Sequence, residues 1–186
     1  MITVGLCNGR TMTIKPDRTF DLTQVTPFVI GHGLARVNRF SGQTQYPYSV
    51  AEHSVHLYDW AKRNRERPAV LAGLLIHDGP ECLGVGDVQR FVKRQYAETL
   101  RGFDHDLTVA LWQQLKPIWA SCIPWDHVEE TIHRYDSQIG SAEAAEFGFP
   151  YTEGDLPDDS NYPDLPLCWN HEYAQREWIK RWREIK

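Results

Sequence analysis

Closely spaced cysteines are missing from this sequence. The four cysteines it has are scattered along the chain as Cys7, Cys82, Cys122 and Cys168. No two of them form a Cys-x-x-Cys pair, which excludes the common zinc-knuckle and dithiol redox motifs. Scattered cysteines are typical of reduced thiols, so we expect a cytoplasmic protein.

Long apolar runs and an excess of basic residues are missing as well. No apolar stretch approaches the length of a transmembrane helix, and residues 1–6 lack the features of a secretion signal. The net charge is −5, with 20 Lys+Arg against 25 Asp+Glu. We therefore expect neither a membrane partner nor a nucleic-acid polymer. A small anionic substrate remains compatible with this charge, because a local group of cations can bind one.

Periodicity and capping signals predict an all-α fold, a single domain over residues 1–186 with about six helices. A chain of 186 residues suits one sizeable core. Residues 1–25 read as a lead-in, in which residues 11–14 indicate a strand of a small β-hairpin. Residues 148–169 are rich in proline and acidic residues and are predicted to form a surface loop. The predicted helices cover about residues 26–38, 49–62, 68–83, 94–115, 126–147 and 170–186. Thr26, Ser49, Asp126 and Asn170 are the predicted caps of the first, second, fifth and sixth of these helices.

The third of these helices contains the most informative stretch of the chain. An apolar run over residues 70–76 is followed directly by His77 and Asp78. Burying an imidazole and a carboxylate without partners costs on the order of several kcal/mol. The pair is therefore predicted to meet either a metal ion or a hydrogen-bond network. The dipeptide alone favours the second alternative, a buried hydrogen bond between His77 and Asp78.

Other polar residues stand where apolar ones would be easier to bury. His53 lies near the start of the second predicted helix, and Asp136 interrupts the apolar face of the fifth. Together with His77 and Asp78 they form a candidate set of two imidazoles and two carboxylates from three helices. Such a set leaves room for solvent and suits Mn, Fe, Co or Zn better than Ca or Mg.

The order His53, His77-Asp78, Asp136 resembles the ligand order of the HD-domain metal-dependent phosphohydrolases. Several further segments resemble successive motifs of one branch, the bacterial 5′-deoxynucleotidases and the related phage enzymes that act on deoxynucleotides such as dATP. These segments are Ile30-Gly31-His32-Gly33-Leu34-Ala35, Asn38-Arg39-Phe40-Ser41-Gly42, Tyr48-Ser49-Val50-Ala51-Glu52-His53-Ser54 and His77-Asp78-x-x-Glu81. The resemblance covers roughly residues 10–147. It implies a helical HD-domain bundle, a divalent transition metal and hydrolysis at the 5′-phosphate of a 2′-deoxynucleotide.

The resemblance also implies roles for single residues. Glu81 would position or deprotonate the attacking water, and Asp87 would protonate the leaving oxygen or hold Glu81 and the sugar. The alternative for Glu81 is a solvated acid at a helix end. Arg39 and Lys93 would bind the phosphates, unless they are exposed surface charges. Phe40 would form a wall for the base or sugar, or simply fill the core.

Some positions depart from the family pattern. Gly79-Pro80 replaces small residues that continue the helix, and the spacer between Glu81 and Asp87 is one residue longer. These departures lie beside the predicted substrate pocket and concern its shape and specificity more than its chemistry. Two alternatives also stay open: a phosphodiesterase acting on a cyclic nucleotide or an alarmone, and a non-catalytic module that senses nucleotides with a bound metal. Relatives in the branch are commonly oligomers, so we expect a homo-oligomer, in the host cytoplasm if the enzyme is phage-encoded.

Overall fold

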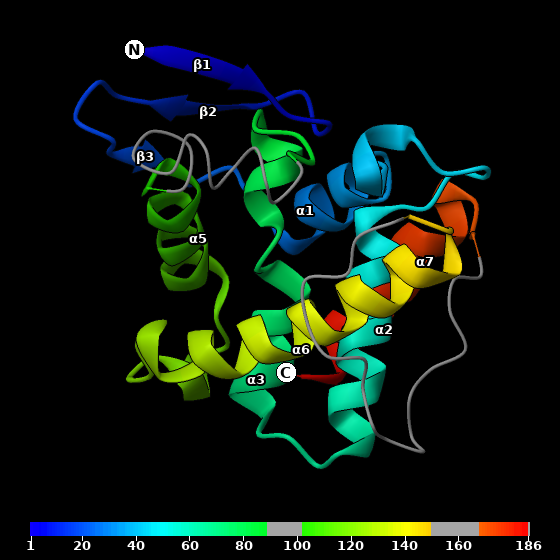
Figure 1. Ribbon diagram of the computed structural model, residues 1–186. Helices are drawn as coiled ribbons and strands as arrows, with labels where there is room; N and C mark the ends of the chain where they lie inside the picture. Colours follow the sequence, from blue (N-terminus) through cyan, green and yellow to red (C-terminus); the bar gives the residue numbers. More distant parts are fainter. Residues whose placement is uncertain (89–101, 150–167, 186) are drawn as a thin grey trace.

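The computed structural model describes residues 1–88, 102–149 and 168–185 (Figure 1). It confirms the predicted fold class, a helical bundle with a small N-terminal sheet. The described helices are α1 (Pro27–Leu34), α2 (Val50–Arg63), α3 (Pro68–Ile76), α5 (Gly102–Leu115), α6 (Asp126–Glu146) and α7 (His171–Glu184), joined in part by the 3₁₀ turns η1 (Arg39–Gly42), η2 (Gly79–Leu83) and η4 (Ile118–Ala120).

The N-terminal sheet has three antiparallel strands rather than the two of the expected hairpin. Strands β1 (Ile2–Gly5), β2 (Thr11–Ile14) and β3 (Phe20–Asp21) lie in that order. Along β2 the side chains of Met12 and Ile14 are buried, whereas Thr11 is exposed. This alternation is the pattern that predicted the strand. The buried side chains of β2 cover one end of the helical core.

Three helix starts follow the predicted caps. Thr26 caps α1 before Pro27, the Ser49 hydroxyl accepts the Glu52 N–H at 3.2 Å, and the Asn170 side chain accepts the Tyr173 N–H at 2.9 Å. Such caps are local in sequence, which explains why they could be read directly. The expectation for α6 was wrong by one position, because Trp125 is the cap and Asp126 is already helical.

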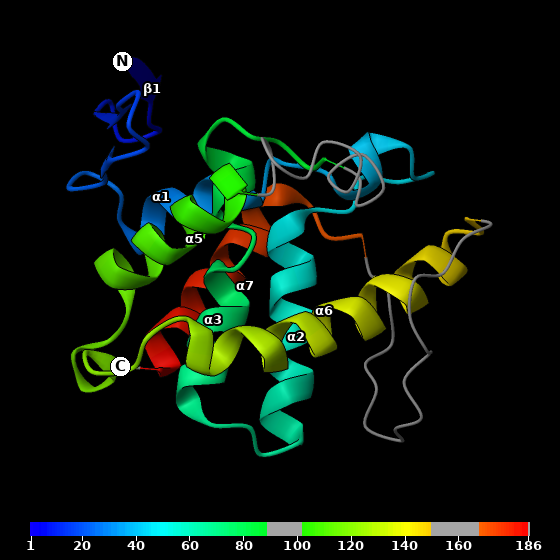
Figure 2. The same ribbon diagram turned by 60° about the vertical axis from the view of Figure 1, so that its left-hand side comes forward.

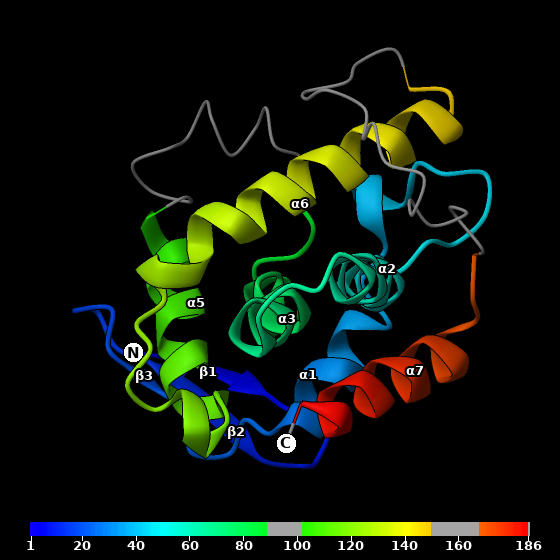
Figure 3. The same ribbon diagram turned by 90° about the horizontal axis from the view of Figure 1, so that it is seen from below.

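Helix α3 lies at the centre of the bundle. Figure 3 shows α2 and α3 end-on, with α1, α5, α6 and α7 around them. Every residue of α3 after Pro68 is buried, as expected of a helix that is apolar on all sides. It packs against α2, α5, α6 and α7. The longest described helix, α6, crosses both α2 and α3 (Figure 2).

Close approach between α3 and α6 depends on a glycine. A Cβ atom added at Gly73 would lie 2.4 Å from Cδ1 of Ile132 and 3.5 Å from Cζ3 of Trp125. With a Cβ atom at this position, the end of the Ile132 side chain or the helix itself would have to move. The spacing also sets how near the polar residues at the end of α3 lie to those carried by α6.

Two predicted helices end earlier than expected. Helix α1 ends at Leu34 rather than near residue 38, and α3 ends at Ile76 rather than near residue 83. Lys93, the first part of the helix predicted over residues 94–115, and most of the loop predicted over residues 148–169 lie outside the described residues. Among the described residues, no helix combines the length and apolar character that crossing a bilayer requires.

Candidate metal centre

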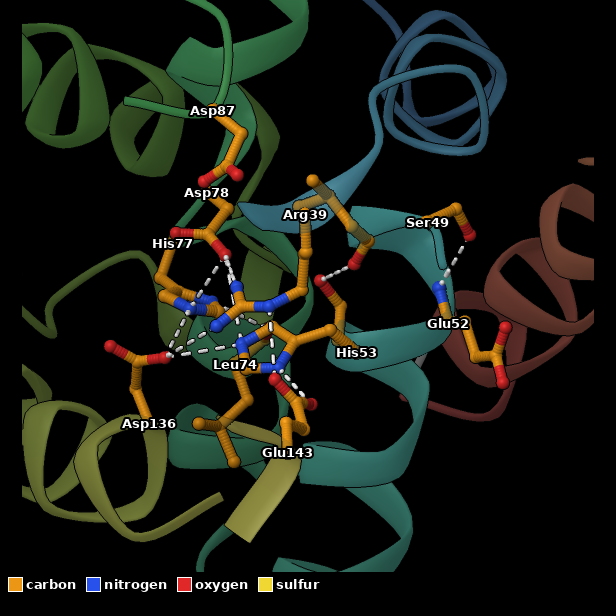
Figure 4. Close-up of polar contacts among 12 residues, drawn as sticks. Arg39, Ser49, Glu52, His53, Leu74, His77, Asp78, Asp87, Asp136 and Glu143 are labelled. Carbon is orange, nitrogen blue, oxygen red and sulfur yellow. Dashed lines mark hydrogen bonds and ion pairs between the residues drawn. The ribbon is translucent and has the colours of Figure 1, made fainter. Parts of the chain in front are cut away.

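Side chains from three helices converge at one point of the core (Figure 4). His53 comes from the first turn of α2, His77 and Asp78 follow the last residue of α3, and Asp136 lies in the middle of α6. One ligand atom each from His53, His77 and Asp136 lie within 4.8 Å of one another. The Oδ2 atom of Asp78 lies 3.2 Å from Nε2 of His77 and 3.7 Å from Nε2 of His53. The structure thus brings together all four residues that the sequence suggested as metal ligands.

Pro80 explains how two neighbouring residues reach the same point. Successive residues of a continuous helix point about 100° apart. Pro80 has no N–H to bond to the Ile76 carbonyl, and it disfavours helical backbone at Gly79. Helix α3 therefore ends, and the chain enters η2 with Asp78 at φ −90° and ψ 11°. At this break in the helix, Oδ2 of Asp78 comes to lie 3.2 Å from Nε2 of His77.

Hydrogen bonds fix which ring nitrogen of each histidine faces the centre. Nδ1 of His77 lies 2.9 Å from the Leu74 carbonyl oxygen, which can only accept, so Nδ1 carries the proton. Nδ1 of His53 donates to the Glu143 carboxylate at 2.7 Å. Both Nε2 atoms therefore face the carboxylates of Asp78 and Asp136. Neutral Nε2 atoms and carboxylates are all acceptors, and a cation between them would satisfy the whole set.

The buried Nε2 atom of His77 supports a cation at this point. It has no hydrogen bond of proper geometry among the described residues, although Oδ2 of Asp78 lies 3.2 Å away. Burial alone would lower the pKa of His77, but Asp78 and Asp136 raise it well above its usual value. Burial would raise the pKa of Asp78, whereas the neighbouring His77 holds it well below its usual range. The carboxylates of Asp78 and Asp136 thus favour a positive charge at this point, which a bound cation would supply.

The charges of the cluster match a divalent cation. Asp78, Asp136 and Glu143 contribute three negative charges, and Arg39 contributes one positive charge. Burial would raise the pKa of Glu143, but Arg39 and His53 lower it, so its carboxylate is ionised. With neutral imidazoles these side chains leave an excess of negative charge, which favours a cation. Imidazole and carboxylate ligands together suit Mn, Fe, Co or Zn.

Arg39 spans the rim of the cluster. Its Nη1 atom lies 3.4 Å from Oδ2 of Asp78, its Nη2 atom 4.0 Å from Oδ1 of Asp136, and its Nε atom 3.0 Å from Oε2 of Glu143. The side chain is only 12% exposed. It is a candidate for binding an anion that also touches the metal, because a guanidinium presents its donors as a planar fork.

Asp87 holds the turn that carries Arg39. Its Oδ2 atom accepts the Ser41 N–H at 3.0 Å, and its carbonyl oxygen accepts the Ser41 hydroxyl at 3.3 Å. Ser41 and Phe40 both have positive φ, 54° and 55°, a conformation that is uncommon for residues with side chains. The two hydrogen bonds stabilise this unusual turn. The part that Asp87 would take in proton transfer stays a prediction.

The structure describes two of the three remaining predicted site residues, Glu81 and Phe40. Glu81 is in η2, one turn after Asp78, and its side chain is buried at 4% exposure. Phe40 stacks on Phe149 with a centroid distance of 4.8 Å and packs edge-on against Phe147. Phe40 is half-buried beside Arg39 and is not part of the hydrophobic core, and its role as a wall for the base or sugar stays a prediction. Lys93 lies outside the described residues.

Sequence reasoning missed Glu143. This residue is completely buried and contacts His53, Arg39 and Tyr48. A signal was present, since Glu143 follows Asp136 by seven residues and therefore lies two turns further along the same face of α6. It lies among small residues at the end of a helix, where a glutamate is normally expected to be exposed to solvent.

Comparison with known proteins leaves the function open. No protein-family model matches the chain. A protein of Rhodobacter capsulatus, itself described as uncharacterized, is 39% identical over 105 residues, which cover 50% of this chain and 52% of the relative. The chain therefore spans about half the length of this relative. The likeness supports no activity, and membership of the HD-domain family stays a prediction from the motifs.

Proposed function

We propose that this protein is a metal-dependent phosphohydrolase that cleaves 2′-deoxynucleotides at the 5′-phosphate. The substrate would be a dNTP such as dATP, releasing triphosphate, or a dNMP, releasing phosphate. The observation that carries the proposal is the convergence of His53, His77, Asp78 and Asp136 with Arg39 at their rim. The choice of a deoxynucleotide comes from the motif resemblance.

The four ligands would hold one Mn, Co, Zn or Fe ion. When bound, such an ion supplies Lewis-acid chemistry, since it neutralises charge on a phosphate oxygen and lowers the pKa of a water molecule. Arg39 would exchange its contacts with Asp78 and Asp136 for contacts with phosphate oxygens. Its fork of donors would then stabilise the negative charge that grows on the phosphate during attack.

Two carboxylates would move the protons. Glu81 lies one turn after Asp78 and is buried, so its carboxylate would take a proton from the attacking water. Asp87, which holds the turn that carries Arg39, would give a proton to the departing 5′-oxygen. The water thus becomes part of the phosphate product, and the nucleoside leaves as an alcohol. Both roles rest on the motif resemblance and on these positions.

A substrate panel tests the proposal. The purified protein, loaded with Mn²⁺ or Co²⁺, is incubated with each dNMP and dNTP, and released nucleoside, phosphate and triphosphate are measured. We expect turnover of at least one deoxynucleotide. Glu81→Gln should lose most turnover while keeping the metal, whereas Glu130→Gln, at an exposed position of α6, should behave as the parent protein.

Other results would overturn the proposal. Cyclic nucleotides and alarmones are incubated in the same way, and turnover of these compounds alone would change the substrate class. Metal binding with no turnover across all panels would indicate the non-catalytic sensing module. The homo-oligomeric state is a separate expectation, and light scattering coupled to size-exclusion chromatography measures it directly.

A further inference from the structure

We infer that Glu143 is a positioning residue that sets both a metal ligand, His53, and the anion-binding residue, Arg39. The inference deepens the proposed function, because it assigns a role inside the same site to a residue that the motifs do not include. It rests on the metal-binding part of that function and does not depend on which nucleotide is hydrolysed.

The carboxylate of Glu143 joins three different parts of the chain. Its Oε1 atom accepts from Nδ1 of His53 at 2.7 Å and from the Tyr48 hydroxyl at 2.6 Å. Its Oε2 atom lies 3.0 Å from Nε of Arg39, an ion pair that lacks the geometry of a hydrogen bond. The side chains of Glu143, His53 and Tyr48 are completely buried. An ionised carboxylate is costly at such a site unless its partners satisfy it, so this arrangement needs a function that apolar packing would not serve.

Glu143 determines which tautomer the His53 imidazole adopts. Because the carboxylate accepts the Nδ1 proton, the lone pair of the neutral ring lies on Nε2. That Nε2 atom is 3.1 Å from Oδ1 of Asp136 and faces the centre of the cluster. A carboxylate behind a metal-binding histidine both orients the ring and makes it a better ligand.

Toward Arg39, the role of Glu143 is to fix the direction of the guanidinium. The carboxylate engages Nε, so Nη1 and Nη2 are left to face Asp78 and Asp136. An anion bound at the metal would meet this pair of nitrogens already oriented. Figure 4 shows Glu143 on the side of Arg39 and His53 that lies away from Asp87.

The neutral analogue separates these roles from simple packing. A carboxylate can accept on both oxygens, whereas the amide of Glu143→Gln has one acceptor and one donor. His53 then faces an N–H group and loses its acceptor, or Arg39 faces that group, and in either orientation Arg39 loses the negative charge of its ion-pair partner. The shape of the side chain is unchanged. The matched control is Glu146→Gln, the same substitution at an exposed position of α6.

The first measurement is the Zn²⁺ affinity of the parent protein and both variants, by titration calorimetry without nucleotide. We expect Glu143→Gln to lose about 10–100-fold in metal affinity, as is typical when a group behind a ligand is removed.

The second measurement is ¹⁵N NMR of the zinc-loaded proteins. The Nδ1 proton of His53 should exchange slowly in the parent and in Glu146→Gln, and rapidly in Glu143→Gln. The third is the affinity of the zinc-loaded proteins for inorganic phosphate, which should also fall.

A gentler variant keeps the inference testable if Glu143→Gln does not fold. Tyr48→Phe removes one of the three partners of the carboxylate and leaves its charge. We expect it to weaken Zn²⁺ binding by a few-fold. Unchanged zinc affinity and an unchanged His53 proton in both folded variants would overturn the inference. A parent protein that binds no zinc would instead overturn the proposed metal centre itself, so the two failures are distinguishable.

Discussion

The guanidinium of Arg39 lies against the same two carboxylates that we assign to the metal ion. Its Nη1 and Nη2 atoms are 3.4 Å from Asp78 and 4.0 Å from Asp136. Like charges repel, so Arg39 opposes the entry of a cation at this point. The same positive charge would attract a phosphate. One residue therefore has opposite effects on the two ligands of the proposed site.

Replacing Arg39 should reveal both effects. We expect Arg39→Gln to raise the affinity for Mn²⁺ by about tenfold, because one nearby positive charge is removed. The affinity for inorganic phosphate, measured on the metal-loaded variant, should fall by about the same factor. Calorimetry measures both, and Arg36→Gln at an exposed position of the chain is the control. Weaker metal binding in Arg39→Gln would contradict the arrangement described.

Asp136 should be indispensable for the ion. Asp136→Asn keeps the size of the side chain but replaces a charged ligand with a weak neutral one. We expect the affinity for Mn²⁺ to fall by at least about 100-fold, beyond what removing an outer partner costs. Metal content after dialysis measures this loss. Asp126→Asn, at an exposed position of the same helix, should bind metal normally.

Residues of the site could be predicted to different extents. His53, His77, Asp78 and Asp136 were found because each is a polar residue within an apolar pattern, and the structure brings them together. Glu143 was missed because its burial comes from the turn around Arg39 and from Tyr48, both distant in sequence. The path of that turn depends on positive φ at Phe40 and Ser41, which no local sequence signal requires.

The helices and strands, like the site residues, could be predicted only in part. Caps at Thr26, Ser49 and Asn170 act within a few residues, so the starts of α1, α2 and α7 could be predicted. The end of α3 is also local in origin, since Gly79-Pro80 stops it, but the apolar pattern suggested a continuation. The third strand of the sheet was not predicted, because β3 is only two residues long.

The packing of α3 on α6 should control the geometry of the metal centre. Gly73→Ala would place a Cβ atom 2.4 Å from Cδ1 of Ile132, which we expect to cost about 1–3 kcal/mol of the free energy of unfolding. Pushing α6 away would also move Asp136 from His77 and weaken Mn²⁺ binding. Urea denaturation and calorimetry measure the two effects.

A second substitution provides the control for Gly73→Ala. Ile132→Val removes the Cδ1 atom that the new methyl group would meet. In the double variant we expect much of the stability and the Mn²⁺ affinity to return, so that the two substitutions are not additive. Additive losses would mean that the close approach of the two helices is not what Gly73 provides.

Helix α7 is fastened to α2 by an ion pair whose strength should depend on pH. Nζ of Lys62 lies 2.7 Å from Oε2 of Glu184, and the Tyr58 hydroxyl lies 3.2 Å from the same atom. The hydrogen bond from Lys62 lowers the pKa of Glu184. A lowered pKa in the folded state means that the pair stabilises above the unfolded pKa of glutamate, about 4.3. The stabilisation is lost as pH falls through the folded pKa.

A double-mutant cycle tests this pH dependence. Lys62 is half-exposed, so we expect Glu184→Gln to lower the free energy of unfolding at pH 7 by less than about 1 kcal/mol. The coupling between Glu184→Gln and Lys62→Gln should be measurable at pH 7 and should disappear as the pH falls through the lowered pKa of Glu184. A coupling that persists at low pH would contradict the assignment to an ion pair.

At the scale of the whole molecule, the proposed ion would join three helices that contribute about half of the described core. Helices α2 and α6 each supply one ligand, and two more directly follow the last residue of α3, which lies against α6 at Gly73. An ion that binds only when these helices are packed binds the folded state and not the unfolded chain. Metal binding should therefore be visible as stability of the whole fold.

We expect Mn²⁺ or Zn²⁺ to raise the melting temperature of the protein. A ligand at about 100 times its Kd adds about 2.7 kcal/mol to the folded state. For a chain of this size each kcal/mol shifts the melting temperature by about 2–4 °C, so the total shift should be about 5–10 °C. Differential scanning calorimetry with added metal or with EDTA measures it. Asp136→Asn should show no shift, because a ligand from α6 is gone, whereas Asp126→Asn should respond as the parent protein does. An equal shift in Asp136→Asn would mean that the stabilising ion binds elsewhere.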